Sequence, residues 1–334
     1  MIGEYSILEV GVFAALVVAA LLLDLHAHKA DKPISMRDAA LWSVFWIALS
    51  LAFALYVGFA HGRDQGMLFL TGYFLEKSLS VDNLFVFIAV FASFSIRPEF
   101  QHRVLYFGII GAVIMRLLFV VLGTSFIALF GKLALTIFGL FVLWTAWKMW
   151  QAGRQDDEEI EDYSNHWSVR LTRRIFPVSP QMRGHDFFVR RDGVWAVTPL
   201  FLCLVTIEIA DVMFAFDSVP AIFAIFAGLR EPLPLGTQTF LVYTSNIFAI
   251  LGLRSLYFLL AAANRFLSRL EAAVIIILVF IGAKMLTGVL GTLHMPPEAG
   301  LIVVFGVLAG GVIASYLFPK KAKNAVDGGD SSGR

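Results

Sequence analysis

The sequence predicts an all-α polytopic membrane protein with about nine transmembrane helices, and three observations lead to this fold class. Hydrophobic residues make up 59% of the 334-residue chain and charged residues only 15%, whereas soluble domains are about half apolar and about a quarter charged. Nine apolar runs are long enough to cross a bilayer. Basic residues alternate between abundant and scarce in successive connections, which is the pattern of the positive-inside rule.

The first apolar run could be taken for a signal peptide. It lacks a basic leader and a small-residue cleavage site, and Glu4 and Glu9 precede its core, so we interpret it as a retained helix. The predicted spans are residues 6–25, 39–60, 66–94, 104–129, 133–150, 198–228, 238–263, 271–292 and 298–318.

The charges of the connections give the orientation. One alternate set, together with the C-terminal tail, holds 18 basic residues and the other set holds three, which predicts an outside N-terminus and a cytoplasmic C-terminus. The only long connection is then cytoplasmic, and its acidic run at 156–162 is interpreted as a solvated linker. The net charge of +1 gives no case for nucleic acid, and the single Cys203 excludes disulfides and thiolate metal clusters.

Ten ionisable residues fall inside predicted spans, where each costs at least about 2.5–3.5 kcal/mol. The bases are Lys77, Arg116, Lys148, Arg254 and Lys284, and the acids are Glu76, Asp82, Glu208, Asp211 and Asp217.

The spacing of these charges repeats. The segment DNLFVFIAVF at 82–91 is similar to DSVPAIFAIF at 217–226, and an acid stands six residues before each leading aspartate. A helix with an arginine and then a helix with a lysine follow in both units. Because each unit has three helices, the two units enter the membrane from opposite sides. This predicts a 3+3 inverted-topology repeat, which is common in secondary transporters.

The repeat divides the chain into six predicted segments. They are two N-terminal helices (1–65), repeat A (66–150), a cytoplasmic loop (151–197), the inverted repeat B (198–292), a last helix (293–319) and a disordered cytoplasmic tail (320–334).

Oxygen ligands dominate the predicted site. We expect Asp82 and Asp217 to form the central cation pair, with Glu76, Asp211 and Glu208 as further ligands or proton-exchange groups and with Asn83 and Ser218 as neutral ligands. An all-oxygen set suits Mn²⁺, Mg²⁺ or Ca²⁺.

The basic residues and a proline complete the predicted site. We expect Arg116 and Arg254 each to tether one acid, Lys148 and Lys284 to pair elsewhere or reach the interface, and Lys77 to serve as a further charge partner. Pro220 has no N–H for the carbonyl of Phe216, so the helix is expected to be interrupted beside Asp217.

Two further interpretations concern the same residues. Five acids balance five bases, so all ten could instead form buried ion pairs that lock the bundle. The sequence contains no HExxH, GxSxG or P-loop motif, and we therefore predict that the chain is not an enzyme.

Two segments resemble the signature segments of the TerC family. They are FLEKSLSVDNLFVF at 74–87 and IEIADVMFAFDSVPAIFAI at 207–225, and FFVRRDGVWAVTPLF at 187–201 resembles the stretch that precedes the second signature. The longer, membrane-only, Alx-like branch is the most similar. The resemblance implies a multi-pass protein of the bacterial inner membrane, associated with manganese efflux and tellurite resistance. The choice of Mn²⁺, and of export over import, follows from the resemblance and not from residue spacing.

The expected function is therefore secondary export of Mn²⁺ in exchange for protons, with Mn²⁺ as the transported ion and no tightly bound cofactor. The expected partners are the lipid bilayer, the divalent cation and protons, and the sequence leaves homo-oligomer formation open. The alternative is a membrane scaffold that supports metallation or tellurite resistance without transport of its own. A passive channel is a third hypothesis.

Overall fold

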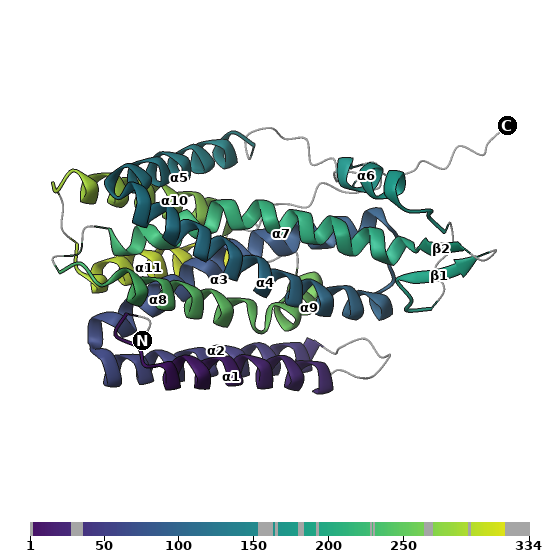
Figure 1. Ribbon diagram of the computed structural model, residues 1–334, viewed down its shortest axis with the longest axis horizontal. Coiled ribbons are helices and arrows are strands. Elements are labelled where there is room, and N and C mark those ends of the chain that lie inside the picture. The colour runs from purple at the N-terminus through teal and green to yellow at the C-terminus, as the bar shows by residue number, and fades with distance from the viewer. Residues whose placement is uncertain are drawn as a thin grey trace.

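The computed structural model describes residues 3–27, 36–152, 163, 166–179, 184–191, 194–227, 229, 231–263, 270–292 and 295–317, and the fold is a bundle of long helices (Figure 1). The long helices are α1 (Ile7–Ala27), α2 (Met36–His61), α3 (Arg63–Ser93), α4 (Pro98–Phe130), α5 (Lys132–Ala152), α7 (Pro199–Phe223), α8 (Leu235–Ile250), α10 (Leu270–Val289) and α11 (Pro297–Leu317). The shorter elements are α6 (Trp167–Ile175), β1 (Phe188–Arg191), β2 (Val194–Val197), η2 (Ala224–Phe226) and α9 (Leu253–Ala263).

The described helices confirm an all-α, multi-pass membrane protein. Six of them (α2, α4, α5, α7, α10 and α11) are long and apolar enough to cross a membrane singly, and α8 with α9 makes a seventh span bent by 42°. The apolar part of α1 is shorter, Ile7–Leu23. Helix α3 carries Glu76, Lys77 and Asp82 along its middle. The count of nine spans stays a prediction.

The charged helix α3 lies in the interior of the bundle. It packs against α2, α7, α8, α10 and α11, so protein surrounds it on most sides. The outer helices instead present large apolar side chains outward, for example Leu55 and Phe59 on α2 and Leu117 on α4. An apolar exterior with charges inside is what a bilayer environment demands, because unpaired charges are expensive in hydrocarbon.

The helix break predicted beside Asp217 is absent, and a break occurs instead at Gly252. Helix α7 continues through Pro220 to Phe223, and η2 follows it directly, so the expected interruption beside Asp217 is wrong. The proline tolerates this position because its fixed φ is helical and only one turn follows. The predicted span 238–263 is instead divided at Gly252, whose φ is +81°. An added Cβ there would lie 2.6 Å from Trp46 Cδ1, so only glycine allows both the conformation and the packing.

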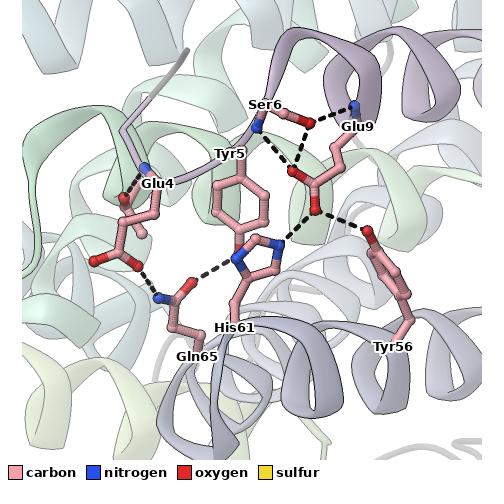
Figure 2. A network of polar contacts seen from close by, with 8 residues as sticks. Glu4, Tyr5, Ser6, Glu9, Tyr56, His61 and Gln65 are labelled. Carbon is pink, nitrogen blue, oxygen red and sulfur yellow. Dashed lines mark hydrogen bonds and ion pairs between the residues drawn. The ribbon is translucent and has the colours of Figure 1, made fainter.

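A polar network holds the N-terminus against α1, α2 and α3 (Figure 2), and the Glu4 backbone N–H donates to Thr237 Oγ1 of α8 at 3.0 Å. Ser6 and Glu9 form a capping box at the start of α1, with the Ser6 backbone N–H 2.7 Å from Glu9 Oε2. The same carboxylate accepts a hydrogen bond from the Tyr56 hydroxyl and lies 2.6 Å from His61 Nε2. The buried hydroxyl of Tyr5 donates to Gln65 Oε1 at 2.8 Å. These contacts fix the pair α1–α2 against the rest of the bundle.

The predicted long loop contains regular structure in its second half. Helix α6 and the hairpin β1–β2 lie at one end of the bundle, beside the start of α7 (Figure 1). The strands pair antiparallel, with Arg190 opposite Trp195. The acidic run at 156–162 lies outside the described residues.

Candidate functional site in the helix bundle

The buried face of α4 places Arg116 inside the bundle. The buried positions recur every three or four residues, which is the period of one helix face, and Arg116, only 4% exposed, is one of them. The face comprises Val104, Leu105, Gly108, Ile109, Ala112, Arg116, Val120 and Gly123. Its small residues let α4 and α7 approach closely, as in many membrane helix pairs.

Arg116 connects three helices. Its guanidinium forms an ion pair with the fully buried Glu76 of α3. The same Nη1 donates a hydrogen bond to Ser218 Oγ of α7 at 2.6 Å. Glu76 belongs to the predicted repeat A and Ser218 to the predicted repeat B. Arg116 therefore makes its contacts at the meeting point of the two predicted units.

A fourth helix, α8, reaches the same centre through Asn246. Its Nδ2 lies 3.5 Å from the second carboxylate oxygen of Glu76, and the side chain is fully buried. Within the described part of the chain, Asn246 Oδ1 and Ser80 Oγ are buried without a hydrogen-bond partner. Unpaired buried acceptors are costly, and they would gain from a bound cation or an ordered water.

Asp211 and Arg254 lie near each other, because both line the same small hollow. Both are nearly buried, with 8% and 3% of their surface exposed, and Leu105 and Leu253 line the hollow with them. The charges of Glu76 and Arg116 also act on Asp211, so the two carboxylates belong to one electrostatic cluster.

Glu208 lies one turn before Asp211 and faces α4 at Gly111. An added Cβ on Gly111 would overlap both carboxylate oxygens of Glu208. The missing side chain of Gly111 therefore provides the room for this partly buried acid. Gly111 is not among the residues predicted for the site, although three small residues, Gly108, Gly111 and Ala112, follow one another at helical spacing.

Two of the three lysines in the predicted spans bond backbone carbonyls inside the bundle, and the third is exposed. Lys77 of α3 donates to the carbonyl of Ala249, at the end of α8, at 3.2 Å. The buried Lys284 of α10 donates to the carbonyl of Ile225, in η2, at 2.9 Å. Each thus satisfies a carbonyl where a helix ends inside the bundle. Lys148 lies apart on an exposed face of α5, with Nζ 5.5 Å from the Trp144 ring centre.

The predicted cation pair is only partly described. Asp82 stands on α3 and Asp217 on α7, but their side chains lie outside the described part of the structure. The residues that follow them, Asn83 and Ser218, are both buried, with 6% and 2% exposed. Among the described side chains, no three of the His, Cys, Asp and Glu type stand close enough to hold a metal ion. A metal site at Asp82 and Asp217 stays a prediction.

The arrangement concentrates carboxylates and fixed cations where α3, α4 and α7 cross. A buried carboxylate that is paired with a guanidinium needs no bound metal ion or proton to neutralise its charge. A carboxylate that is not paired with a neighbouring cation can exchange protons or bind a metal ion. The cluster is therefore suited to the transfer of cations or protons between the two ends of the bundle.

Comparisons with known proteins agree with the earlier resemblance. Residues 61–323 match the profile of the family described as integral membrane protein TerC family. The Tellurium resistance protein TerC of Serratia marcescens is 46% identical over 95% of this chain and 96% of its own. The protein of Escherichia coli K12 named "Putative membrane-bound redox modulator Alx" is 41% identical over 89% of this chain and 91% of its own.

An uncharacterized membrane protein of Myxococcus xanthus is 39% identical over 93% of this chain and 92% of its own. No solved structure matches the chain.

Proposed function

Because the chain belongs to the TerC family of integral membrane proteins, we propose that it is a secondary transporter. Its substrate is a divalent cation, with Mn²⁺ the expected ion, and it exports this cation across the bacterial inner membrane in exchange for protons. Asp82 and Asp217 bind the cation. Glu76, Asp211 and Glu208 adjust the charge of the site as protons enter and leave.

The observation that carries this proposal is the double contact of Arg116. It pairs with Glu76 and donates to Ser218 at 2.6 Å, so a fixed charge joins the two predicted repeats deep in the bundle. In transporters built from inverted repeats, the substrate site lies near the midplane between the repeats. Asp82 and Asp217, six residues after Glu76 and Asp211, stand on the two helices that Arg116 joins.

The packing of the helices supports the inverted repeat. Helix α3 packs on α8, and α4 packs on α7. If the two units are exchanged, α3 takes the place of α7 and α8 takes the place of α4. The α3–α8 pair then becomes the α7–α4 pair. The third helices, α5 and α10, pack on each other, where Gly139 and Gly282 bring the backbones together. A pseudo-twofold axis relates elements in this way.

The choice of substrate rests on ligand chemistry and on the family. Carboxylate, amide and hydroxyl oxygens suit hard divalent cations. The curated relatives are named for tellurium resistance and for redox modulation, and neither name specifies a transported ion. The single Cys203 is fully buried, which gives no support to a thiol-based redox reaction. A stress-resistance role through metal export fits the family better.

Transport in proteoliposomes tests the proposal. Purified chain is reconstituted into vesicles that contain a dye quenched by Mn²⁺, and quenching is followed with and without an imposed pH gradient. We expect quenching in the wild type and none in Asp82→Asn or Asp217→Asn. The exposed Asp64→Asn serves as the matched control, because it removes one carboxylate at the end of α3 and should transport normally.

Three outcomes would contradict the proposal. Folded, monodisperse wild-type protein that moves no Mn²⁺ under any gradient would favour the scaffold function. Quenching that is indifferent to both aspartates would place the cation path elsewhere. Flux that does not respond to the pH gradient would remove the proton coupling and indicate a channel.

A further inference from the structure

Helix α6 has three distinct faces. At about 100° per residue, Ser168, Val169 and Thr172 fall on one face and are buried. The next face carries large apolar side chains that are exposed, and the last carries exposed arginines. The apolar face consists of Trp167, Leu171 and Ile175, with 48%, 49% and 62% of their surfaces exposed. The basic face consists of Arg170, Arg173 and Arg174.

The buried face fixes α6 beside the first turns of α7. Ser168 Oγ lies 3.3 Å from Thr206 Oγ1, and Val169 packs in a small cluster with Val197 and Leu202. After α6, Val178 bridges to Val197 at the end of β2. The helix therefore lies beside the first turns of α7, at the end of the bundle that carries the hairpin (Figure 1).

The basic face has no acidic partner in the described part of the chain. Among the described residues, no ion pair joins a carboxylate to Arg170, Arg173 or Arg174. Two of the arginines stand in the last turn, where the helix dipole favours them, but the dipole does not account for the apolar face. The hairpin repeats the combination, since exposed Arg190 faces exposed Trp195 across the strands.

We propose that α6 is an interfacial helix that binds anionic lipid headgroups. Trp167, Leu171 and Ile175 insert between the acyl chains, and the three arginines bind lipid phosphates at the surface. An amphipathic helix with aromatic and aliphatic residues beside a basic face is the form that binds anionic bilayers. The membrane is the partner that fits both faces at once, because α6 is held where a spanning helix enters the bilayer. This inference does not depend on the transported ion.

Lipid quenching of Trp167 tests the inference on the full-length protein. The protein in micelles is titrated with brominated phosphatidylglycerol or brominated phosphatidylcholine, and the signal of Trp167 is the difference between wild type and Trp167→Phe. Each basic group near an anionic surface strengthens binding by about fivefold. We therefore expect half-quenching at a concentration at least tenfold lower with phosphatidylglycerol, and we expect added salt to reduce this preference.

The test variant is Arg170→Gln/Arg173→Gln/Arg174→Gln, which should abolish the preference and leave quenching by phosphatidylcholine unchanged. The matched control is Arg63→Gln/Arg97→Gln/Lys132→Gln, which removes three exposed charges elsewhere and should keep the preference. Equal quenching by both lipids in the wild type, or equal loss in the control, would overturn the inference. So would a Trp167 that neither lipid quenches, which would indicate a protein surface in its place.

Discussion

Arg116 and Ser218 are 102 residues apart in the sequence, yet Arg116 Nη1 donates to Ser218 Oγ at 2.6 Å. The same guanidinium pairs with Glu76, so one buried arginine holds α3, α4 and α7 together. The contact lies beside Asp217 in the sequence, and it links the stability of the bundle to the proposed cation site.

Breaking the Glu76–Arg116 pair should destabilise the protein strongly. Glu76→Gln or Arg116→Met leaves one buried charge without its partner, which costs about 3–5 kcal/mol. The double variant should cost less than the sum of the single variants, because no unpaired charge remains. Equilibrium unfolding in mixed micelles measures these free energies. Glu99→Gln is the control, since it removes only an exposed partner of Arg97 and should cost less than about 1 kcal/mol.

Gly111→Ala should destabilise the α4–α7 contact by about 1 kcal/mol, the low end of the cost of overpacking, because the new Cβ overlaps the Glu208 carboxylate and this flexible side chain has to rotate away. The added substitution Glu208→Ala should restore the stability by clearing this space. Gly306→Ala on α11 provides the control, since nothing lies within 4 Å of its Cβ position. Melting temperatures in detergent report the result. A Gly111→Ala variant as stable as Gly306→Ala would contradict the assigned contact.

Gly252→Ala should be more damaging than Gly291→Ala. Both glycines have positive φ, +81° and +68°, and alanine pays about 1–2 kcal/mol for such a conformation. At Gly252 the Cβ also meets Trp46, whereas nothing lies near Gly291. The difference between the two variants in thermal unfolding isolates the packing at the α8–α9 break. Equal losses of stability in the two variants would mean that Trp46 moves away from the new Cβ at no cost in free energy.

Lys284→Met should reduce stability, because it removes the charge-assisted hydrogen bond to the Ile225 carbonyl at 2.9 Å. Such a bond contributes about 1.5–3 kcal/mol. Lys148→Met removes the same charge from the exposed face of α5 and should change stability little. The pair of variants is compared by chemical unfolding. If Lys148→Met reduced stability as much as Lys284→Met, the buried hydrogen bond of Lys284 would not be the cause of the loss.

The stability of the N-terminal network should fall in strongly alkaline solution. Burial, and then the charges of Glu9 and Glu4, raise the pKa of Tyr5 above its usual value of 10.0. Folding therefore favours the protonated phenol, and this stabilisation is complete below the unfolded pKa and declines as pH rises above it. Tyr5→Phe should weaken the decline between about pH 10 and 12, measured by melting temperature. The exposed Tyr316→Phe should leave it unchanged.

Much of the bundle could be predicted from residue patterns. Long apolar runs predict spans because backbone groups in lipid must be satisfied within a helix. The arginine within a buried stripe predicts an acidic partner, because a lone buried charge is too costly. Which acid pairs with Arg116, and that Ser218 joins it, depends on the packing of α3 and α7 and has no local signal.

Other features could not be predicted because their signals are short. The break of the predicted span 238–263 depends on a single Gly252 against Trp46. At Pro220 the sequence predicts a break that the structure does not contain. Helix α7 continues through this proline, which lies within one turn of the helix end. Helix α6, with nine residues, is too short for its periodicity to stand out in a polar connection.

The proposed function requires that Asp82 and Asp217 together bind a divalent cation inside the bundle. Mn²⁺ titration followed by electron paramagnetic resonance tests it directly, because bound Mn²⁺ loses the sharp six-line spectrum of the free ion. We predict saturable binding to the wild type, competed by excess Mg²⁺ or Ca²⁺ and lost in both Asp82→Asn and Asp217→Asn, with Asp64→Asn unaffected. Unchanged binding by both aspartate variants, with the protein folded, would contradict the account.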